Sequence, residues 1–122
     1  MASGRPVVLL VDDEDHILSA LQRVLRREPY DLITASNPAD ALARLAAQPV
    51  RVVVSDQKMP GASGVELLRE VAQRYPATKR VLLTGWPEEI AARDRDAAKL
   101  DAILPKPWDE AQLKETLQRC VG

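Results

Sequence analysis

Three short segments limit the choice of fold more than any other feature, because each contains an almost continuous run of Val and Leu: residues 7–11, 50–55 and 80–84. A strand with one face in water alternates apolar and polar residues, whereas these segments present Val and Leu to both faces. Such runs are typical of strands buried on both sides in a parallel sheet covered by helices. Two weaker runs, at 31–35 and 101–104, complete five predicted strands.

A segment with the apolar period of a helix follows each predicted strand. Four of these helices have a recognisable start. The second begins with the cap Asn37 followed by Pro38, and the third with a capping box of Ser63 and Glu66. The fourth begins at Pro87, and the fifth is capped by Asp109. The predicted inward-facing residues, helix by helix, are Ile17, Leu21, Val24 and Leu25 with Leu18 at the edge, then Ala41, Leu42 and Leu45, then Val65, Leu68, Val71 and Ala72, then Ile90, Ala91, Ala97 and Ala98, then Leu113, Leu117 and Val121. Five successive βα units predict an α/β fold, with one doubly wound parallel sheet and helices on both faces.

Composition excludes several classes of function. The 122 residues are predicted to form one domain, residues 1–122, and a net charge of −1 argues against direct binding to nucleic acid or to an anionic membrane. Cys120 is the only cysteine, which excludes an internal disulfide and fits a reducing compartment. No secretory leader or membrane-spanning run is recognisable, so the expected location is cytoplasmic.

Acidic residues follow two of the strongest strands. Asp12 and Asp13 come directly after the first, and Asp56 comes at the end of the third. In an open parallel sheet, ligands bind outside the carboxyl ends of the strands, where strand order reverses. Three carboxylates gathered there repel one another, and Lys106 after the last strand offsets only one charge. The remaining charge of about −2 predicts a divalent ion that prefers oxygen ligands, Mg²⁺ or alternatively Mn²⁺.

Each of these residues also has an ordinary interpretation when it is taken alone. Asp12-Asp13 could be a solvated loop, Asp56 a turn residue, Thr84 a strand-end hydroxyl, and Lys106 a surface lysine. Only their joint occurrence at strand ends favours a shared site. The two tryptophans are predicted to pack at the surface near that site, and the single histidine is predicted to be exposed and not a ligand.

The chain resembles the receiver domain of bacterial two-component response regulators from about residue 7 to residue 117. The matching landmarks, in chain order, are Asp12-Asp13, Asp56 with Met59-Pro60-Gly61-Ala62-Ser63-Gly64, Thr84-Gly85 and Lys106-Pro107. The resemblance implies a flavodoxin-like (βα)5 domain with strand order 2-1-3-4-5. The residues around these landmarks are similar to those of receivers attached to cyclic-di-nucleotide phosphodiesterase or transcription-activating modules.

The resemblance also implies a role for each residue of the site. Asp56 would accept the phosphoryl group, while Lys106 and the Thr84 hydroxyl would each hold a phosphoryl oxygen. Asp13 and Asp56 would bind Mg²⁺ directly, Asp12 mostly through water, and the main-chain carbonyl of Lys58 would complete the protein ligands. Two further residues would shape access: Gly85 leaves room for the donor, and Pro107, which often follows a cis bond in this family, sets the geometry of the lysine.

The implied partner is a histidine kinase or a histidine phosphotransfer protein, which would dock on the first helix near His16, Ser19, Ala20 and Arg23. The fourth helix, fifth strand and fifth helix could form a homodimer or bind an effector. Such a domain is not an enzyme in the usual sense, because it catalyses only its own phosphorylation and dephosphorylation. Two alternatives remain open: a small Mg²⁺-dependent phosphatase of the haloacid-dehalogenase type, since Asp13 and Asp15 have that spacing, and a degenerate receiver that only binds partners.

The sequence departs from the family at the position three residues before Lys106. Many receivers have an aromatic residue or histidine there, whose ring moves inward during switching, whereas this chain has Ile103. The following Pro105 removes a backbone donor, which favours an edge strand. The switch is therefore expected to involve Thr84, the Gly85-Trp86 loop and a thinly packed fourth helix.

Overall fold

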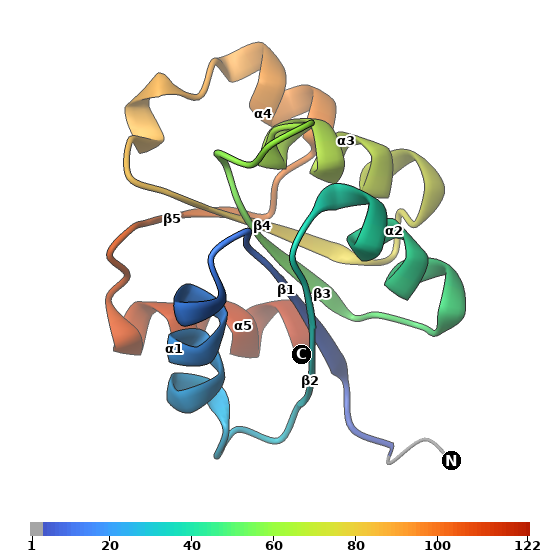
Figure 1. The fold of residues 1–122 in the computed structure, drawn as a ribbon, viewed down its shortest axis with the longest axis vertical. Coiled ribbons are helices and arrows are strands. Elements are labelled where there is room, and N and C mark those ends of the chain that lie inside the picture. The colour runs from blue at the N-terminus through green and yellow to red at the C-terminus, as the bar shows by residue number, and fades with distance from the viewer. Residues whose placement is uncertain (1–3) are drawn as a thin grey trace.

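A computed structural model describes residues 4–122 and contains one five-stranded sheet (Figure 1). Its strands are β1 (Val7–Val11), β2 (Asp31–Ala35), β3 (Val52–Asp56), β4 (Lys79–Thr84) and β5 (Ala102–Pro105). All neighbours are parallel, in the order β2-β1-β3-β4-β5. The predicted fold class and strand order are therefore confirmed.

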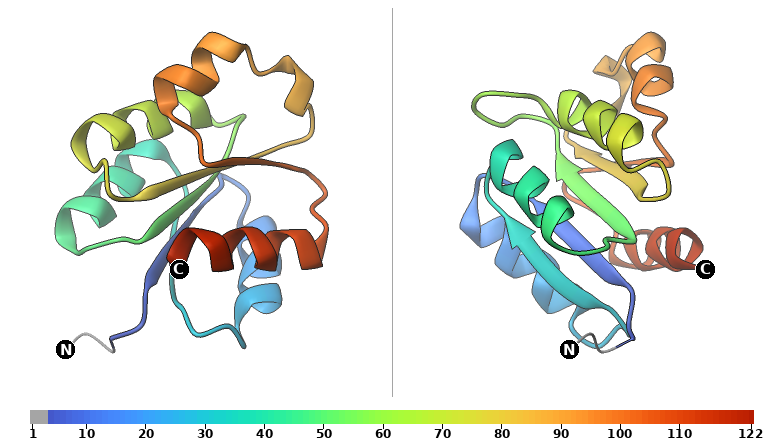
Figure 2. Two further views of the ribbon diagram at one scale, coloured as in Figure 1. Left: turned by 180° about the vertical axis from the view of Figure 1, so that it is seen from behind. Right: turned by 90° about the vertical axis from the view of Figure 1, so that its right-hand side faces the viewer.

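Helices cover both faces of this sheet, as Figures 1 and 2 show. On one face lie α1 (Asp15–Leu25) and α5 (Glu110–Val121). On the other lie α2 (Pro38–Ala47), α3 (Gly64–Arg74) and α4 (Ala92–Ala98). Within residues 4–122, no helix is both long enough and apolar enough to cross a bilayer.

The central strands bury both of their faces. Val8 and Leu10 of β1 pack in the core beneath α1 and α5, whereas Leu9 and Val11 pack in the core beneath α2, α3 and α4. All four side chains are at most 1% exposed. Because each fully buried side chain of this size contributes about 1.5–3 kcal/mol, both cores need apolar residues at successive positions of the strand. This requirement explains the continuous apolar runs in the sequence.

The predicted helix caps are present for three helices. The Asn37 side chain accepts the Asp40 N–H at 2.8 Å, and the Asp109 side chain accepts the Gln112 N–H at 2.8 Å. Ser63 and Glu66 form the reciprocal capping box of α3. Each of these caps satisfies backbone donors that the helix itself leaves unpaired, so they fix where α2, α3 and α5 begin.

The predicted start of the fourth helix at Pro87 is wrong. Residues Pro87–Glu89 form a single 3₁₀ turn, η1, and α4 begins only at Ala92. Between them the extended backbone of Ile90 buries its side chain to 8% exposure. The Arg95 guanidinium stabilises the break, because it donates hydrogen bonds to the main-chain oxygens of Ile90 (3.2 Å) and Pro87 (2.9 Å).

Smaller differences concern strand ends and helix faces. The third strand begins two residues later than predicted and includes Asp56. The fourth begins one residue earlier with the same end, and the fifth is shifted by one residue toward the carboxyl terminus. In α1, Leu18 is buried and Ile17 only partly so, which rotates the predicted apolar stripe. Other residues of the predicted stripes that are only partly buried or exposed are Val24, Leu42, Ala72, Ala91, Ala97 and Val121. Buried Leu67 and Cys120 were not predicted to face inward.

The end of α4 is fastened to the start of β4. Arg80 is only 7% exposed, and its Nε donates a 3.0 Å hydrogen bond to the main-chain oxygen of Lys99. Lys99 ends α4 in a left-handed conformation with φ 49°. The Arg80 N–H also donates to the Asp101 carboxylate at 2.8 Å, so the turn into β5 is held from two sides.

Candidate functional site

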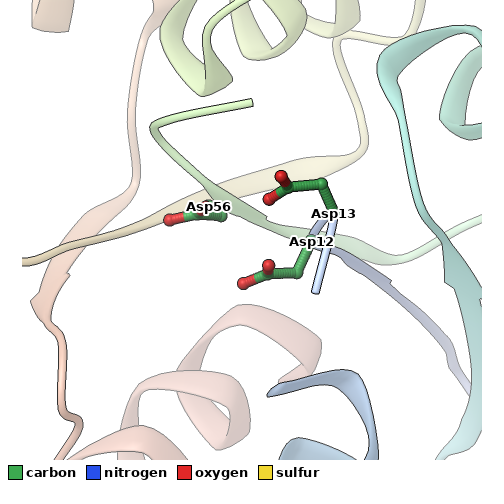
Figure 3. Close-up of side chains that lie close together, drawn as sticks. All are labelled: Asp12, Asp13 and Asp56. Atoms are coloured by element: carbon green, nitrogen blue, oxygen red, sulfur yellow. The ribbon is translucent and has the colours of Figure 1, made fainter. Parts of the chain in front are cut away.

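The three predicted acidic residues lie together at the carboxyl edge of the sheet. β1 and β3 are adjacent and parallel, so Asp12 and Asp13 follow β1 beside Asp56, the last residue of β3. One carboxylate oxygen from each residue lies within 4.8 Å of the others, an arrangement that could hold a metal ion. Figure 3 shows the three side chains extending into the same region beyond the strand ends. Asp12 and Asp56 are buried, and Asp13 is exposed.

Lys106 places its ammonium between the two buried carboxylates. Its Nζ lies 2.9 Å from Asp12 Oδ2 and 3.1 Å from Asp56 Oδ1. The Lys106 N–H donates to the Thr84 oxygen at 2.9 Å, which extends the pairing of β4 and β5 to the base of this side chain. The peptide bond between Lys106 and Pro107 is cis. One ammonium thus pairs with two of the three carboxylates of the cluster.

The two residues at the centre of the site have shifted pKa values. Burial is the main reason why the pKa of Asp56 is raised, and the nearby Asp12 charge adds to the effect, while Lys106 opposes it. Burial acts to lower the pKa of Lys106, but its hydrogen bonds to Asp12 and Asp56 outweigh burial and raise that pKa. Both shifts favour the protonated forms, as expected where negative charge is in excess.

Asp12 and Asp13 differ in whether their carboxylate oxygens already accept hydrogen bonds. Asp12 Oδ1 accepts the Glu14 N–H at 2.9 Å, and Asp12 Oδ2 accepts the hydrogen bond from Lys106. The exposed Asp13 carboxylate lies at the open side of the cluster. The Asp13 carboxylate is therefore the more accessible of the two.

A hollow of about 280 Å³ lies beside Asp56 and Lys106. Its lining residues are Glu14, Asp56, Gln57, Lys58, Thr84, Gly85, Trp86 and Lys106. Thr84 is buried, and its hydroxyl oxygen accepts the Trp86 N–H at 3.1 Å, which leaves the hydroxyl proton free to be donated. Gly85 is exposed and presents no side chain to this space, as predicted.

The loop that carries Lys58 is anchored at both ends by Gln57, a contribution that the sequence analysis missed. The Gln57 N–H donates to the Leu83 oxygen at 3.1 Å, and its main-chain oxygen accepts the Gly64 N–H at 2.9 Å. Its side-chain oxygen accepts the Val65 N–H at 2.9 Å. A Cβ at Gly64 would overlap the main-chain oxygen of Asp56, so this close approach requires glycine. The sequence signal for this close approach was the glycine at position 64, at the end of the segment that follows Asp56.

The remaining predicted residues lie around this hollow and not in it. Ile103 is partly buried against the core beneath α2, α3 and α4. Pro107 lines a separate apolar hollow of about 360 Å³ with Ile17, Lys106 and Trp108. His16 is exposed, as predicted, and its Nε2 lies 3.1 Å from the Glu14 carboxylate.

Residues 8–118 match the family model of the response regulator receiver domain. The chain belongs to this family. The receiver domain is 39% identical to the hydrogenase transcriptional regulatory protein HoxA of Cupriavidus necator over 123 residues, which cover 99% of this chain and 25% of HoxA. Receiver domains are signalling modules of two-component systems, in which response regulators receive phosphoryl groups from histidine kinases.

Two solved structures extend the comparison. The signal receiver domain of an HD domain-containing protein from Pseudomonas fluorescens superposes with a TM-score of 0.92 at 36% identity and covers 99% of this chain and 90% of that one. The response regulator TrrA from Thermotoga maritima, solved in complex with Mg(2+)-BeF, has a TM-score of 0.86 at 30% identity, with coverage of 94% and 98%. The receiver domain itself spans about a quarter of the length of HoxA.

The phosphatase alternative is not favoured. It required Asp13 and Asp15 to act together after β1, but Asp15 is the exposed first residue of α1 and lies outside the acidic cluster. The carboxylate that joins Asp12 and Asp13 comes from β3. The arrangement corresponds to a receiver domain, and receiver domains bind Mg²⁺ at such an acidic pocket.

Proposed function

We propose that this receiver domain takes a phosphoryl group from a phosphohistidine onto Asp56 and requires a divalent cation to do so. The observation that supports this assignment is the position of the Asp56 carboxylate between two other carboxylates and an ammonium group. Asp56 lies within 4.8 Å of Asp12 and Asp13 on one side and 3.1 Å from the Lys106 ammonium on the other. Asp12 also lies 2.9 Å from this ammonium, but both of its oxygens already accept hydrogen bonds. Asp56 is the one carboxylate of the cluster that lines the hollow.

In the proposed step, a carboxylate oxygen of Asp56 attacks phosphorus and forms an acyl phosphate. The phosphorus–nitrogen bond to the donor imidazole breaks, and its electron pair stays with that nitrogen, which takes up a proton. Phosphoryl transfer depends mainly on positioning and on neutralising charge. The Lys106 ammonium and the Thr84 hydroxyl donate hydrogen bonds to two phosphoryl oxygens, and Gly85 leaves space for the donor ring.

The residues present fit an ion that prefers oxygen ligands. Asp13 and Asp56 would bind it directly, Asp12 would act through water because both of its oxygens are engaged, and the Lys58 carbonyl would supply a further ligand. Mg²⁺ is the expected ion, and Mn²⁺ would be accepted in its place. When bound, it would offset the negative charge of the phosphoryl oxygens.

The proposed donor is a histidine kinase or a histidine phosphotransfer protein that docks on α1 beside the site. The exposed residues His16, Ser19 and Arg23 lie on this helix. The surface formed by α4, β5 and α5 is the proposed route to a second copy or an effector, and the setting is the cytoplasm. Pro107 sets the direction of Lys106 in this scheme, and no turnover of generic phosphate esters is expected.

Acetyl phosphate with Mg²⁺ tests the acceptor assignment directly. Intact-mass spectrometry should detect one phosphoryl adduct, which hydroxylamine removes because it cleaves acyl phosphates. Asp56→Asn should abolish the adduct, whereas the matched control Asp15→Asn should retain it. A label located mainly on another residue would overturn the assignment. Loss of the adduct in Asp15→Asn, together with hydrolysis of p-nitrophenyl phosphate, would instead support the phosphatase alternative.

A further inference from the structure

A cation–π contact joins two loops at the mouth of the site. The Lys58 ammonium, from the loop between β3 and α3, lies 4.0 Å from the centroid of the Trp86 ring, from the loop between β4 and η1. Trp86 is the one large apolar side chain within residues 4–122 that is strongly exposed, at 50%. A cation at this distance from an indole face is attracted by the ring, and the contact is weak enough at an exposed site to be exchanged for another.

Both side chains start from backbone that is held in place. Lys58 follows Gln57, which is fixed to β4 and to the start of α3 by hydrogen bonds. Trp86 donates its N–H to the Thr84 hydroxyl, and the following proline restricts its backbone. The contact therefore depends on where two fixed loops direct their side chains. A displacement of the Thr84 hydroxyl would therefore act on the Trp86 backbone through this hydrogen bond.

The contact separates two hollows. Gln57, Lys58, Thr84 and Trp86 line both the 280 Å³ hollow over Asp56 and a larger one of about 630 Å³. The larger hollow continues toward the start of α3 and toward η1. Lys58 and Trp86 thus lie between the acidic site and the segment that leads from η1 into α4.

The charges explain why this contact is informative. Lys106 pairs with Asp12 and Asp56 of the three clustered carboxylates. Within the described part of the chain, Lys58 makes no ion pair with any of the three. The ring instead holds this second cation beside the cluster. Addition of a phosphoryl group to Asp56 adds negative charge next to Lys58, and attraction to that charge grows while attraction to the ring does not.

We propose that Trp86 is a positioning residue that holds the Lys58 ammonium off the acidic site until Asp56 is phosphorylated. This inference rests on the proposed function. Phosphorylation draws Lys58 from the ring to the phosphoryl group, and the freed indole lets the loop before η1 rearrange. The exchange provides an aromatic readout in a chain that has Ile103 where many receivers have a ring. It also places an ammonium where it hinders the water that hydrolyses the acyl phosphate.

Fluorine NMR of protein labelled with 5-fluorotryptophan tests this exchange, because the chain has only two tryptophans, Trp86 and Trp108. Trp86→Phe assigns the signals. Acetyl phosphate with Mg²⁺ should shift the Trp86 signal in wild type toward its position in unphosphorylated Lys58→Met. The Lys58→Met variant, which keeps the length but loses the charge, should lose most of that shift. Lys58→Arg, which keeps a cation able to stack on the ring, should retain it.

Dephosphorylation gives an independent readout, measured as decay of the mass adduct after acetyl phosphate is removed. Lys58→Met should decay severalfold faster than wild type, and Lys58→Arg should stay close to wild type. An unchanged Trp86 shift in Lys58→Met, with Asp56 occupied, overturns this inference and leaves the proposed function intact. Absence of any adduct on Asp56 in wild type overturns both.

Discussion

Replacing the proposed phosphoacceptor with its neutral isostere should stabilise the protein when no divalent ion is present. Asp56→Asn removes a buried charge that lies within 4.8 Å of Asp12, a repulsion of about 3.5 kcal/mol at an effective dielectric constant of about 20. It also removes the attraction to Lys106 at 3.1 Å, which is about 5 kcal/mol on the same scale. On this scale the lost attraction exceeds the relieved repulsion by about 1.5 kcal/mol, and Lys106 keeps Asp12 as its partner.

The cost of removing a carboxylate from water decides the sign. That cost is several kcal/mol for a buried ion, and an amide does not incur it. The raised pKa of Asp56, caused first by burial, gives the same sign. We therefore expect a net gain of about 1 kcal/mol in the free energy of unfolding at neutral pH, which raises the Tm by about 4 °C for a domain of this size.

The gain should depend on pH in one direction. Folding raises the pKa of Asp56, so below its ordinary pKa of 3.8 the carboxyl is protonated in both states and costs no stability. As pH rises above this value and through the raised pKa of the folded state, the buried charge destabilises the wild-type protein. Urea unfolding in EDTA should thus give equal stabilities for wild type and Asp56→Asn in acid and a widening difference toward neutral pH. Asp96→Asn, at an exposed position on α4, serves as the control and should change stability by less than about 0.5 kcal/mol. A less stable Asp56→Asn at neutral pH would refute this electrostatic reasoning.

Three further predictions follow from the same geometry. Titration calorimetry should find one Mg²⁺ site without phosphate, and Asp13→Ala should remove most of this binding; unchanged affinity would place the ion elsewhere. Gly64→Ala should cost about 2–4 kcal/mol in urea unfolding, because the new methyl group overlaps the oxygen of Asp56; a wild-type midpoint would contradict the close approach. Ile103→Tyr should alter the unphosphorylated protein but not abolish the Trp86 response to phosphorylation, as measured by its fluorine signal; complete loss of that response would show that the last strand controls the switch.

The sheet and the acidic cluster could be predicted because their signals are local and redundant. Continuous Val and Leu runs define strands with two buried faces, and parallel strands bring their carboxyl ends to one edge. Asp12, Asp13, Asp56 and Lys106 were therefore placed together without knowledge of the exact register. Three helix starts were also correct, because a side-chain cap within one turn determines each of them.

The errors arose where a particular side-chain contact, and not a cap within one turn, determines the structure. The break between η1 and α4 depends on the Arg95 guanidinium bonding to Pro87 and Ile90, and no local signal distinguishes that arginine from an exposed one. A proline in a first turn is compatible with either a long helix or a short 3₁₀ turn. The Lys58–Trp86 contact was missed for a similar reason, since its two residues lie on different loops.

The bonds of Arg80 give α4 a pivot. They hold the carboxyl end of this seven-residue helix at Lys99, while its other end meets η1 through the reach of one arginine side chain. A helix of this length extends about 10 Å, so a rotation of about 10° around the Lys99 end displaces the Ala92 end by about 2 Å. If phosphorylation displaces α4, we expect the displacement to be largest at Ala92 and to decrease steadily toward Lys99.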